Sequence, residues 1–211
     1  MISDKFFSLL SIICLFANLM SCSVYEETVP NTENINLLAW ESFEEGDYQT
    51  AYSKFGEVLD IDPRDQEALH GRAWSALLLS DALDAIKDFK AAIYYGNSSL
   101  DPLAGLAFAY HANQEYSMCI NKAKAVLASN TYYYFEHKPV INFRDLHLIL
   151  ASAYFQTGNL SRAYEHILIL QPDISFAQPD SSHYEFNGQL YSGYSELILA
   201  IIDYLDVLYG M

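Results

Sequence analysis

Small residues recur along the chain at a fixed spacing, in segments whose apolar positions do not alternate as they would in strands. Ala39, Ala73 and Ala107 lie 34 residues apart, and Ala151 follows after 44. A second series has the same spacing and consists of Ala51, Ala85, Cys119 and Ala163. Small residues let two helices cross closely, and stacked helix pairs bury the apolar face that each pair leaves open. The pattern therefore predicts stacked pairs of antiparallel helices.

The first of these units carries a motif as well as a spacing. Its small, turn and aromatic positions are, in order, Ala39, Gly46, Tyr48, Ala51, Phe55 and Pro63. This arrangement resembles the tetratricopeptide repeat (TPR), a 34-residue helix–turn–helix unit. Later copies keep the small positions but replace the turn glycine, as at Ser80 and Gln114, or regain it, as at Gly158. The resemblance implies an all-α, right-handed TPR-type solenoid with about four repeats and a C-terminal apolar helix.

The resemblance also implies boundaries along the chain. We expect one helical domain over 35–211, with repeats at about 32–65, 66–99, 100–131 and 144–175 and an insert at 132–143. Asp62-Pro63 and Asp101-Pro102 support these limits, because proline suits the first turn of a helix and disrupts its interior. A loop-like stretch with Pro172 and Pro179 follows the fourth repeat, and a final helix is expected over 189–209.

That final segment is unusually apolar for the end of a solenoid, where a polar outer face is normal. Its acidic residues are Glu196, Asp203 and Asp206, and most of the remaining surface is apolar. Three acids disfavour a membrane span, because each charge is costly in hydrocarbon. We expect this helix to pack on the fourth repeat and also to enter the groove or to mediate dimerisation.

The N-terminus is typical of an export signal. Residues 6–20 form an almost unbroken apolar run behind Lys5, shorter than the roughly 20 residues that a spanning helix needs. Leu19-Met20-Ser21-Cys22 resembles the bacterial lipobox, which implies a signal peptide at 1–21, a lipid on Cys22 and a flexible tether at 22–34. Ser23 then implies an outer-membrane anchor facing the periplasm. Ordinary cleavage after Ser23 and an uncleaved anchor are the alternatives.

Charge and cysteine content narrow the class of partner. Eleven Lys and Arg residues face 27 Asp and Glu residues, a formal net charge of -16. Nucleic acid is therefore an unfavourable partner, because its binders neutralise phosphates with Lys and Arg. Cys14 lies in the signal segment and Cys22 would carry the lipid, which leaves Cys119 without an intrachain partner. A disulfide framework is excluded, and Cys119 is expected to be a small core residue.

In TPR proteins the first helix of each repeat lines a groove that commonly holds a peptide or a helix. Carried over residue by residue, the groove positions are Trp40, Phe43, Glu44, His70, Trp74, Leu77, Phe108, His111 and Phe155. Three of them, Trp40, Trp74 and Phe108, form an aromatic stripe that Ser152 interrupts. Aromatic side chains dominate many binding interfaces, so this set predicts a partner site. The alternative is that the same rings pack against the C-terminal helix.

The insert is a second candidate surface. It begins with four consecutive aromatic residues, Tyr132, Tyr133, Tyr134 and Phe135. One face of a helix cannot bury four successive side chains, so a contact loop for a partner or a membrane interface is one interpretation. The alternative is an extension of the third repeat's second helix that buries half of them.

No group of residues in the sequence has the spacing of a catalytic or metal site. The six histidines are scattered, without His-Glu-x-x-His or Cys-x-x-Cys spacing, and there is no nucleophile elbow or phosphate-binding glycine loop. We therefore expect no enzyme activity, metal or cofactor. The expected function is a membrane-anchored scaffold that binds a peptide or helix of a cell-envelope protein. A carbohydrate-binding or uptake-associated lipoprotein, and a self-associating structural protein, are the alternatives.

Overall fold

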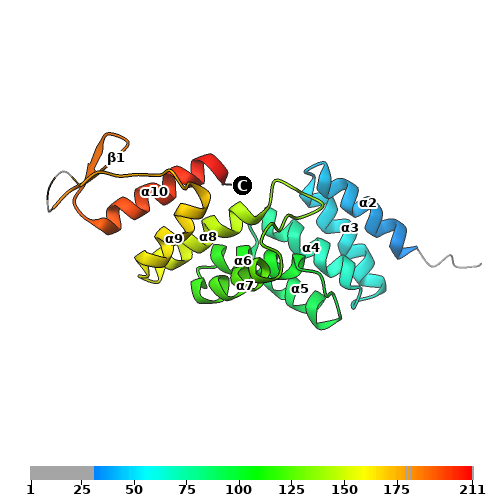
Figure 1. Ribbon diagram of the computed structural model, residues 1–211. Coiled ribbons are helices and arrows are strands. Elements are labelled where there is room, and N and C mark those ends of the chain that lie inside the picture. Colours follow the sequence, from blue (N-terminus) through cyan, green and yellow to red (C-terminus); the bar gives the residue numbers. More distant parts are fainter. Residues whose placement is uncertain (1–30, 179, 181, 211) are drawn as a thin grey trace, which may run out of the picture. The chain divides into compact units, whose positions relative to one another are not determined.

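Helical hairpins account for most of the protein. The computed structural model describes residues 31–178, 180 and 182–210, so the expected signal peptide, Cys22 and most of the expected tether lie outside the described residues. In the described part, four hairpins follow one another (Figure 1): α2 (Thr32–Glu44) with α3 (Tyr48–Ile61), α4 (Gln66–Leu78) with α5 (Ala82–Tyr94), α6 (Asp101–Ala112) with α7 (Tyr116–Ser129), and α8 (Phe143–Gln156) with α9 (Leu160–Leu170). Residues 130–142, between α7 and α8, are called the insert below.

Acidic and amide side chains begin several of these helices. Asp47, Asp65 and Asp81 each accept a hydrogen bond of 2.8–3.0 Å from the backbone N–H three residues later, at the starts of α3, α4 and α5. At the start of α8, the side chain of Asp145 accepts the backbone N–H of Asn142 at 2.7 Å. Each such cap stabilises a helix by about 1 kcal/mol, because it satisfies a donor that has no partner within the helix. These residues therefore fix where the helices begin.

The turn inside each hairpin has left-handed backbone at one repeated position. The φ angle is +87° at Gly46 and +80° at Gly158, the two copies that retain glycine. It is +67° at Ser80 and +61° at Gln114, where the motif glycine is replaced. Glycine adopts this conformation without steric cost, whereas a residue with a Cβ does not. The backbone of the repeat is thus more regular than its sequence.

Neighbouring hairpins fit together through an aromatic ring and a glycine. The ring of Phe55 in α3 lies over Gly71 in α4, and a Cβ on that glycine would lie 2.1 Å from Cζ of the ring. Phe89 and Gly105 repeat this arrangement with the same 2.1 Å separation at the next junction. The two glycines are therefore required for the close approach of successive hairpins.

The C-terminal region contains a β-hairpin where the sequence predicted a loop leading directly into a helix. Strand β1 (Tyr184–Phe186) pairs antiparallel with β2 (Gln189–Tyr191), and Phe186 faces Gln189 across the turn. The turn residues Asn187 and Gly188 have φ angles of +50° and +77°. Asn-Gly is the preferred pair for such two-residue turns, because both positions require positive φ. The helix expected at 189–209 consequently begins later, as α10 (Tyr194–Tyr209).

Helix α10 packs on the fourth hairpin, as predicted (Figure 1). Its buried side chains form a core with residues of α8 and α9; on α10 these are Leu197, Ile198, Ile201, Ile202 and Leu205. The all-α architecture of stacked hairpins is therefore confirmed. Among the described helices, none combines the length and the apolar composition needed to cross a membrane.

Candidate binding groove

The first helices of the hairpins, α2, α4, α6 and α8, carry most of the residues expected to line a groove. The aromatic stripe does lie along them, but it is not open to solvent. The exposed fractions of Trp40, Trp74 and Phe108 are 5%, 0% and 4%. The C-terminal helix is not what covers the two tryptophans, as the alternative interpretation supposed. The insert covers them.

The insert folds back across α2 and α4 (Figure 1) and places two of its rings on the tryptophans. The ring of Phe135 stacks on Trp74, with the ring centres 4.3 Å apart and the planes at 16°. The ring of His137 stacks on Trp40 at 3.6 Å and 4°. Its Nδ1 lies 2.8 Å from Oε1 of Glu44. A segment of the chain itself therefore occupies this half of the groove as a peptide ligand would.

The indole N–H groups of the two tryptophans beneath the insert are paired. Nε1 of Trp40 donates to Oε1 of Glu67 at 2.6 Å, and Nε1 of Trp74 donates to Nε2 of His70 at 3.0 Å. Burial lowers the pKa of His70 to about 3, so its ring is neutral at neutral pH and can accept this bond. Phe43 completes the enclosure, with its ring centre 5.8 Å from that of Phe135. We call these six residues of α2 and α4 the filled site: Trp40, Phe43, Glu44, Glu67, His70 and Trp74.

The four consecutive aromatics of the insert comprise Tyr132 in a turn and an extended segment, Tyr133 to Phe135, whose rings alternate between its two sides. Tyr133 and Phe135 are buried, whereas Tyr132 and Tyr134 are 74% and 58% exposed. The hydroxyl of Tyr133 donates to Oδ1 of Asp101 at 2.8 Å, and burial raises the pKa of this tyrosine. The backbone N–H of Phe135 donates to the carbonyl of Ile141 at 2.9 Å. Half of the rings are therefore buried, as the alternative interpretation expected. The segment that places them is extended, however, and is not an extension of α7.

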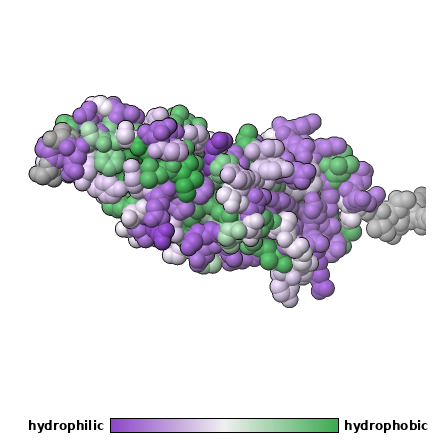
Figure 2. All heavy atoms as spheres, viewed as in Figure 1, coloured by the Kyte–Doolittle hydropathy of each residue, from purple (hydrophilic) through white to green (hydrophobic). Residues whose placement is uncertain are grey.

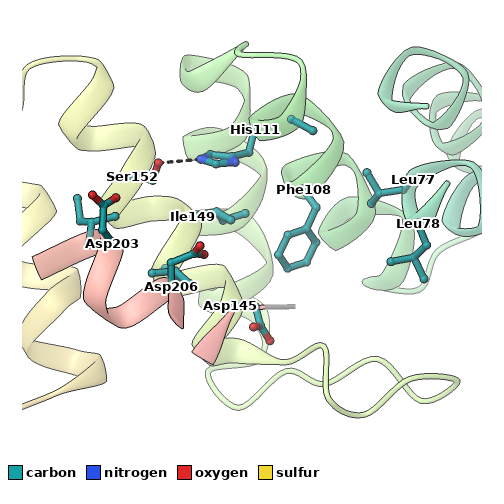
Figure 3. Close-up of a pocket in the computed structure, with 13 residues that line it drawn as sticks. Leu77, Leu78, Phe108, His111, Asp145, Ile149, Ser152, Asp203 and Asp206 are labelled. Carbon is teal, nitrogen blue, oxygen red and sulfur yellow. Dashed lines mark hydrogen bonds between the residues drawn. The ribbon is translucent and has the colours of Figure 1, made fainter. Parts of the chain in front are cut away.

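Beyond the insert, the groove is open. A cavity of about 430 Å³ lies between α4, α6, α8 and α10 (Figure 3). Three expected groove residues line it: Leu77, Phe108 and His111. On the side of α10, Asp203 and Asp206 face these residues across the space. We call this space the open cavity; its size is in the range of small-ligand and side-chain pockets.

The open cavity combines an apolar lining with an acidic edge. Nε2 of His111 lies 2.9 Å from Oγ of Ser152, and burial lowers the pKa of His111, so this pair is neutral at neutral pH. Three lining residues are acidic: Asp145, Asp203 and Asp206. Asp145 already serves as a helix cap, and burial raises its pKa. The lining residues include no Lys or Arg, so the charge of this cavity favours a cationic group.

A second hollow continues the open surface past the insert. It has a volume of about 530 Å³ and shares Leu77, Leu78 and Gly210 with the open cavity. Its remaining lining comes from α3, the insert and α10: Tyr48, Lys138, Val140 and Tyr209. A ligand longer than one side chain could therefore extend from the open cavity along the outer side of the insert.

The structure divides the expected site residues into three sets. Trp40, Phe43, Glu44, His70 and Trp74 lie in the filled site, while Leu77, Phe108 and His111 line the open cavity. Phe155 belongs to neither and is partly buried against the core of α10. Sequence reasoning did not include the α10 residues among the site residues. The sequence feature that could have indicated them is the broad apolar surface of the last helix, which implies that this helix packs against more than one neighbouring element.

Other reactive groups in the described residues do not form a site. No cluster of three or more His, Cys, Asp or Glu side chains is placed to hold a metal ion in residues 31–178, 180 and 182–210. Cys119 is buried, and burial raises the pKa of its thiol to about 12, so it is a neutral core residue. The groove is thus the main candidate site.

Comparison with solved structures identifies the fold. The sequence matches no protein-family model and no curated protein. The structure is similar to MamA, residues 41 to the end, from Desulfovibrio magneticus RS-1: 16% identity over 67% of this chain and 75% of that chain, with a TM-score of 0.57. TTC0263, a TPR protein of Thermus thermophilus, is 21% identical over 67% of this chain and 75% of that chain, with a TM-score of 0.50. At such identities the likeness shows the fold alone.

The structure is also similar to a tetratricopeptide repeat protein from Parabacteroides merdae ATCC 43184. The similarity extends over 84% of this chain and 59% of that chain, at 17% identity and a TM-score of 0.52. The all-α TPR-type solenoid that the sequence predicted is therefore the fold of this protein.

Proposed function

We propose that the protein is an interaction scaffold that binds a segment of another protein in the open half of its groove. The observation that carries this proposal is the open cavity, which lies where TPR-type solenoids present their inner surface and is not covered by the insert. Stacked repeats produce extended concave surfaces suited to peptides and helices. The apolar lining supplies affinity, and the acidic edge supplies orientation.

Trp and Tyr rings can stack on sugars, which is the basis of the carbohydrate-binding alternative, but the two tryptophans of the groove are covered. Trp40 has His137 stacked on it, and Trp74 has Phe135. A sugar ring needs a free aromatic face, and neither residue offers one in this arrangement. The groove therefore supports a protein ligand better than a glycan.

Crosslinking followed by copurification from native membranes tests the proposal. Leu78 borders both the open cavity and the adjoining hollow, so Leu78→Glu should reduce recovery of the partner at least about tenfold by introducing a charge into the apolar contact. Leu83→Glu is the matched control, because Leu83 is an exposed leucine on the neighbouring α5. Equal recovery of the same partner by both variants would contradict the proposal.

Self-association is a separate outcome of this experiment. Hydrophobic residues gather over α10 in Figure 2, and Val207 and Leu208 at its end are exposed. If a differently tagged copy of the chain is the main crosslinked protein, and its capture is insensitive to Leu78→Glu, the protein is a self-associating structural component instead.

The proposal includes an anchor on the cell envelope. The lipobox-like sequence ending at Cys22 supports a lipid-anchored protein on the outer membrane, facing the periplasm. Two or three acyl chains suffice for stable attachment. Cys22→Ala should release the protein from membranes and abolish labelling by a radioactive fatty acid; continued labelling would refute the assignment of Cys22.

A further inference from the structure

The open cavity is built from the same repeat positions as the filled site, two repeats further along the chain. Two steps of 34 residues lead from Trp40 to Phe108, and one step of 34 and one of 44 lead from Trp74 to Ser152. The same steps carry the six residues of the filled site, in order, to Phe108, His111, Ala112, Asp145, Leu148 and Ser152. All six of these successors line the open cavity.

The substitutions between the two sites explain why one is open. Trp74 corresponds to Ser152, and Trp40 corresponds to the smaller Phe108. At one position the indole ring is absent, and at the other a smaller phenyl ring replaces it. Both changes leave space at this part of the groove. In Figure 3, Phe108 and Ser152 lie at the edges of this space, with His111 hydrogen-bonded to Ser152 between them.

The filled site shows what kind of group these positions accept. Phe135 enters the site and is fully buried there, and His137, two residues later, reaches Glu44 at the rim. The ligand of the filled site is therefore an aromatic residue followed, after one intervening residue, by a side chain that bonds to an acid.

The open cavity has an acidic rim as well, but from a different element. The position of Glu44 is occupied by Ala112, while Asp203 and Asp206 are supplied by α10. Neither of these two carboxylates forms an ion pair with another residue in the part of the chain that the structure describes. A positive charge placed near them would therefore be attracted to both.

We infer that the open cavity takes an aromatic side chain of the partner, and that Asp203 and Asp206 bind a basic side chain two residues further along. The ligand class is thus a protein segment of the type aromatic–x–basic, the same type as Phe135-Glu136-His137 in the protein's own insert. This inference rests on the proposed function, because it names the kind of segment that the groove would bind.

A peptide copied from the insert is a direct probe. The peptide acetyl-Tyr-Phe-Glu-His-Lys-Pro-amide has the sequence of residues 134–139, and it would be titrated into full-length protein carrying ¹³C-labelled Leu and Ile methyl groups. We expect saturable NMR shifts at Leu78, Leu148, Ile149 and Ile202. Replacing the peptide's phenylalanine by alanine should weaken binding at least about tenfold, because the aromatic anchor supplies most of the buried area.

The acidic rim is tested with the basic position of the peptide. Replacing its histidine by arginine should strengthen binding about twofold to fivefold at pH 7.5, which is the range expected for a partly exposed ion pair. The double substitution Asp203→Asn with Asp206→Asn should remove that gain and leave the contribution of the phenylalanine unchanged. An arginine gain that survives the double substitution would overturn the role of the two carboxylates.

A protein variant tests the location. Ser152→Trp restores the residue type found at this position in the first two repeats, and it should fill the cavity and abolish the shifts. Leu83→Ala, on the exposed side of α5, should leave them unchanged. If Ser152→Trp does not fold, the alanine-substituted peptide still decides the question. Equal binding of the phenylalanine and alanine peptides, or shifts confined to another surface, would overturn the inference.

The two proposals fail separately. If the peptide does not bind but Leu78→Glu still abolishes partner recovery, the groove binds a protein of another chemistry and the aromatic–x–basic class is wrong. If the peptide binds in the open cavity but partner recovery is insensitive to Leu78→Glu, the ligand class stands and the scaffold function through this groove is wrong.

Discussion

The filled site and the open cavity occupy equivalent positions of their repeats, but the insert fills the first and leaves the second empty. In the first, two tryptophans stack on rings supplied by the insert, and the Trp and Phe side chains are all buried. In the second, a phenylalanine and a serine replace those tryptophans, and α10 approaches from the other side without closing the space. The repeat thus provides two equivalent sites, one filled by the insert and one with an open cavity.

This difference shows that the size of a groove residue does not by itself make it a binding residue. The largest aromatic side chains of the groove attract a segment of the same chain, because burying them in water-free contacts stabilises the fold. Where the residues are smaller, at Phe108 and Ser152, a cavity remains beside them, although Phe108 itself is buried. In this protein, the path of the insert therefore determines which part of the groove is covered and which part contains a cavity.

Substitution of Phe135 is expected to have the largest effect of the variants that test the difference between the two sites. Phe135 is fully buried among the aromatic residues of the filled site, so Phe135→Ala should lower the free energy of unfolding by about 3–5 kcal/mol, measured by urea denaturation. The cost combines the lost transfer of the ring with the space left between the two tryptophans.

Tyr134→Ala is the control for this measurement, because its ring lies on the opposite, solvent-exposed side of the same segment. Its effect should stay within about 0.5 kcal/mol. If the two substitutions had equal effects, the insert would not be part of the core, and the filled site would be as available to a partner as the open cavity.

A smaller effect distinguishes the two sites by their histidines. Burial lowers the pKa of His70 to about 3 in the folded protein, from its ordinary value of 6.5. The folded state therefore binds fewer protons than the unfolded state below pH 6.5, so this contribution to stability is complete above about pH 6.5 and is lost as the pH falls from there towards 3. Between pH 7.5 and pH 5.0, the loss due to His70 should be on the order of 1–2 kcal/mol.

His70→Gln should reduce this pH dependence, since the introduced amide can still accept the hydrogen bond from Trp74 but does not titrate. His111→Gln, in the open cavity, should reduce it less, because His111 is less buried and the charge of Asp206 opposes the lowering of its pKa by desolvation. Urea denaturation of the three proteins at both pH values measures the effect. Identical pH dependence in all three would show that His70 does not titrate as a buried group.

The TPR-like motif and its 34-residue spacing together were sufficient to predict the fold, because each small or aromatic position meets the same surroundings in every hairpin. The turns show how far this holds. Ser80 and Gln114 have lost the glycine of the motif, yet both retain its positive φ. The stacking of the hairpins therefore imposes the turn conformation where the local sequence does not favour it.

The β-hairpin was missed although its signal is present in the sequence. Asn187-Gly188 is a strong two-residue turn signal, but the flanking strands have three residues each, too few for a sustained alternation. The helix prediction was extended over the second strand because Leu190 and Tyr191 continue the apolar composition of α10.

The groove residues were predicted as a set, but the division between covered and open positions was not. The path of the insert depends on tertiary contacts, such as the bond from Tyr133 to Asp101 and the stacking of Phe135 on Trp74. Nothing in the spacing of the repeats specifies where an inserted segment returns. The alternation of buried and exposed rings from Tyr133 to Phe135 follows from extended backbone, which aromatic residues favour over a helix.

The fit of Phe55 over Gly71, and of Phe89 over Gly105, has a consequence for the modularity of the array. Of the four hairpins, the second carries both parts of this fit, a glycine in its first helix and a phenylalanine in its second. Copies of that unit would therefore be sterically compatible in tandem. At the third junction the corresponding residues are Ala123 and Ile149, with the small side chain now on the earlier hairpin. A copy of the second hairpin inserted before the third would therefore meet the same phenylalanine-to-glycine fit on both sides.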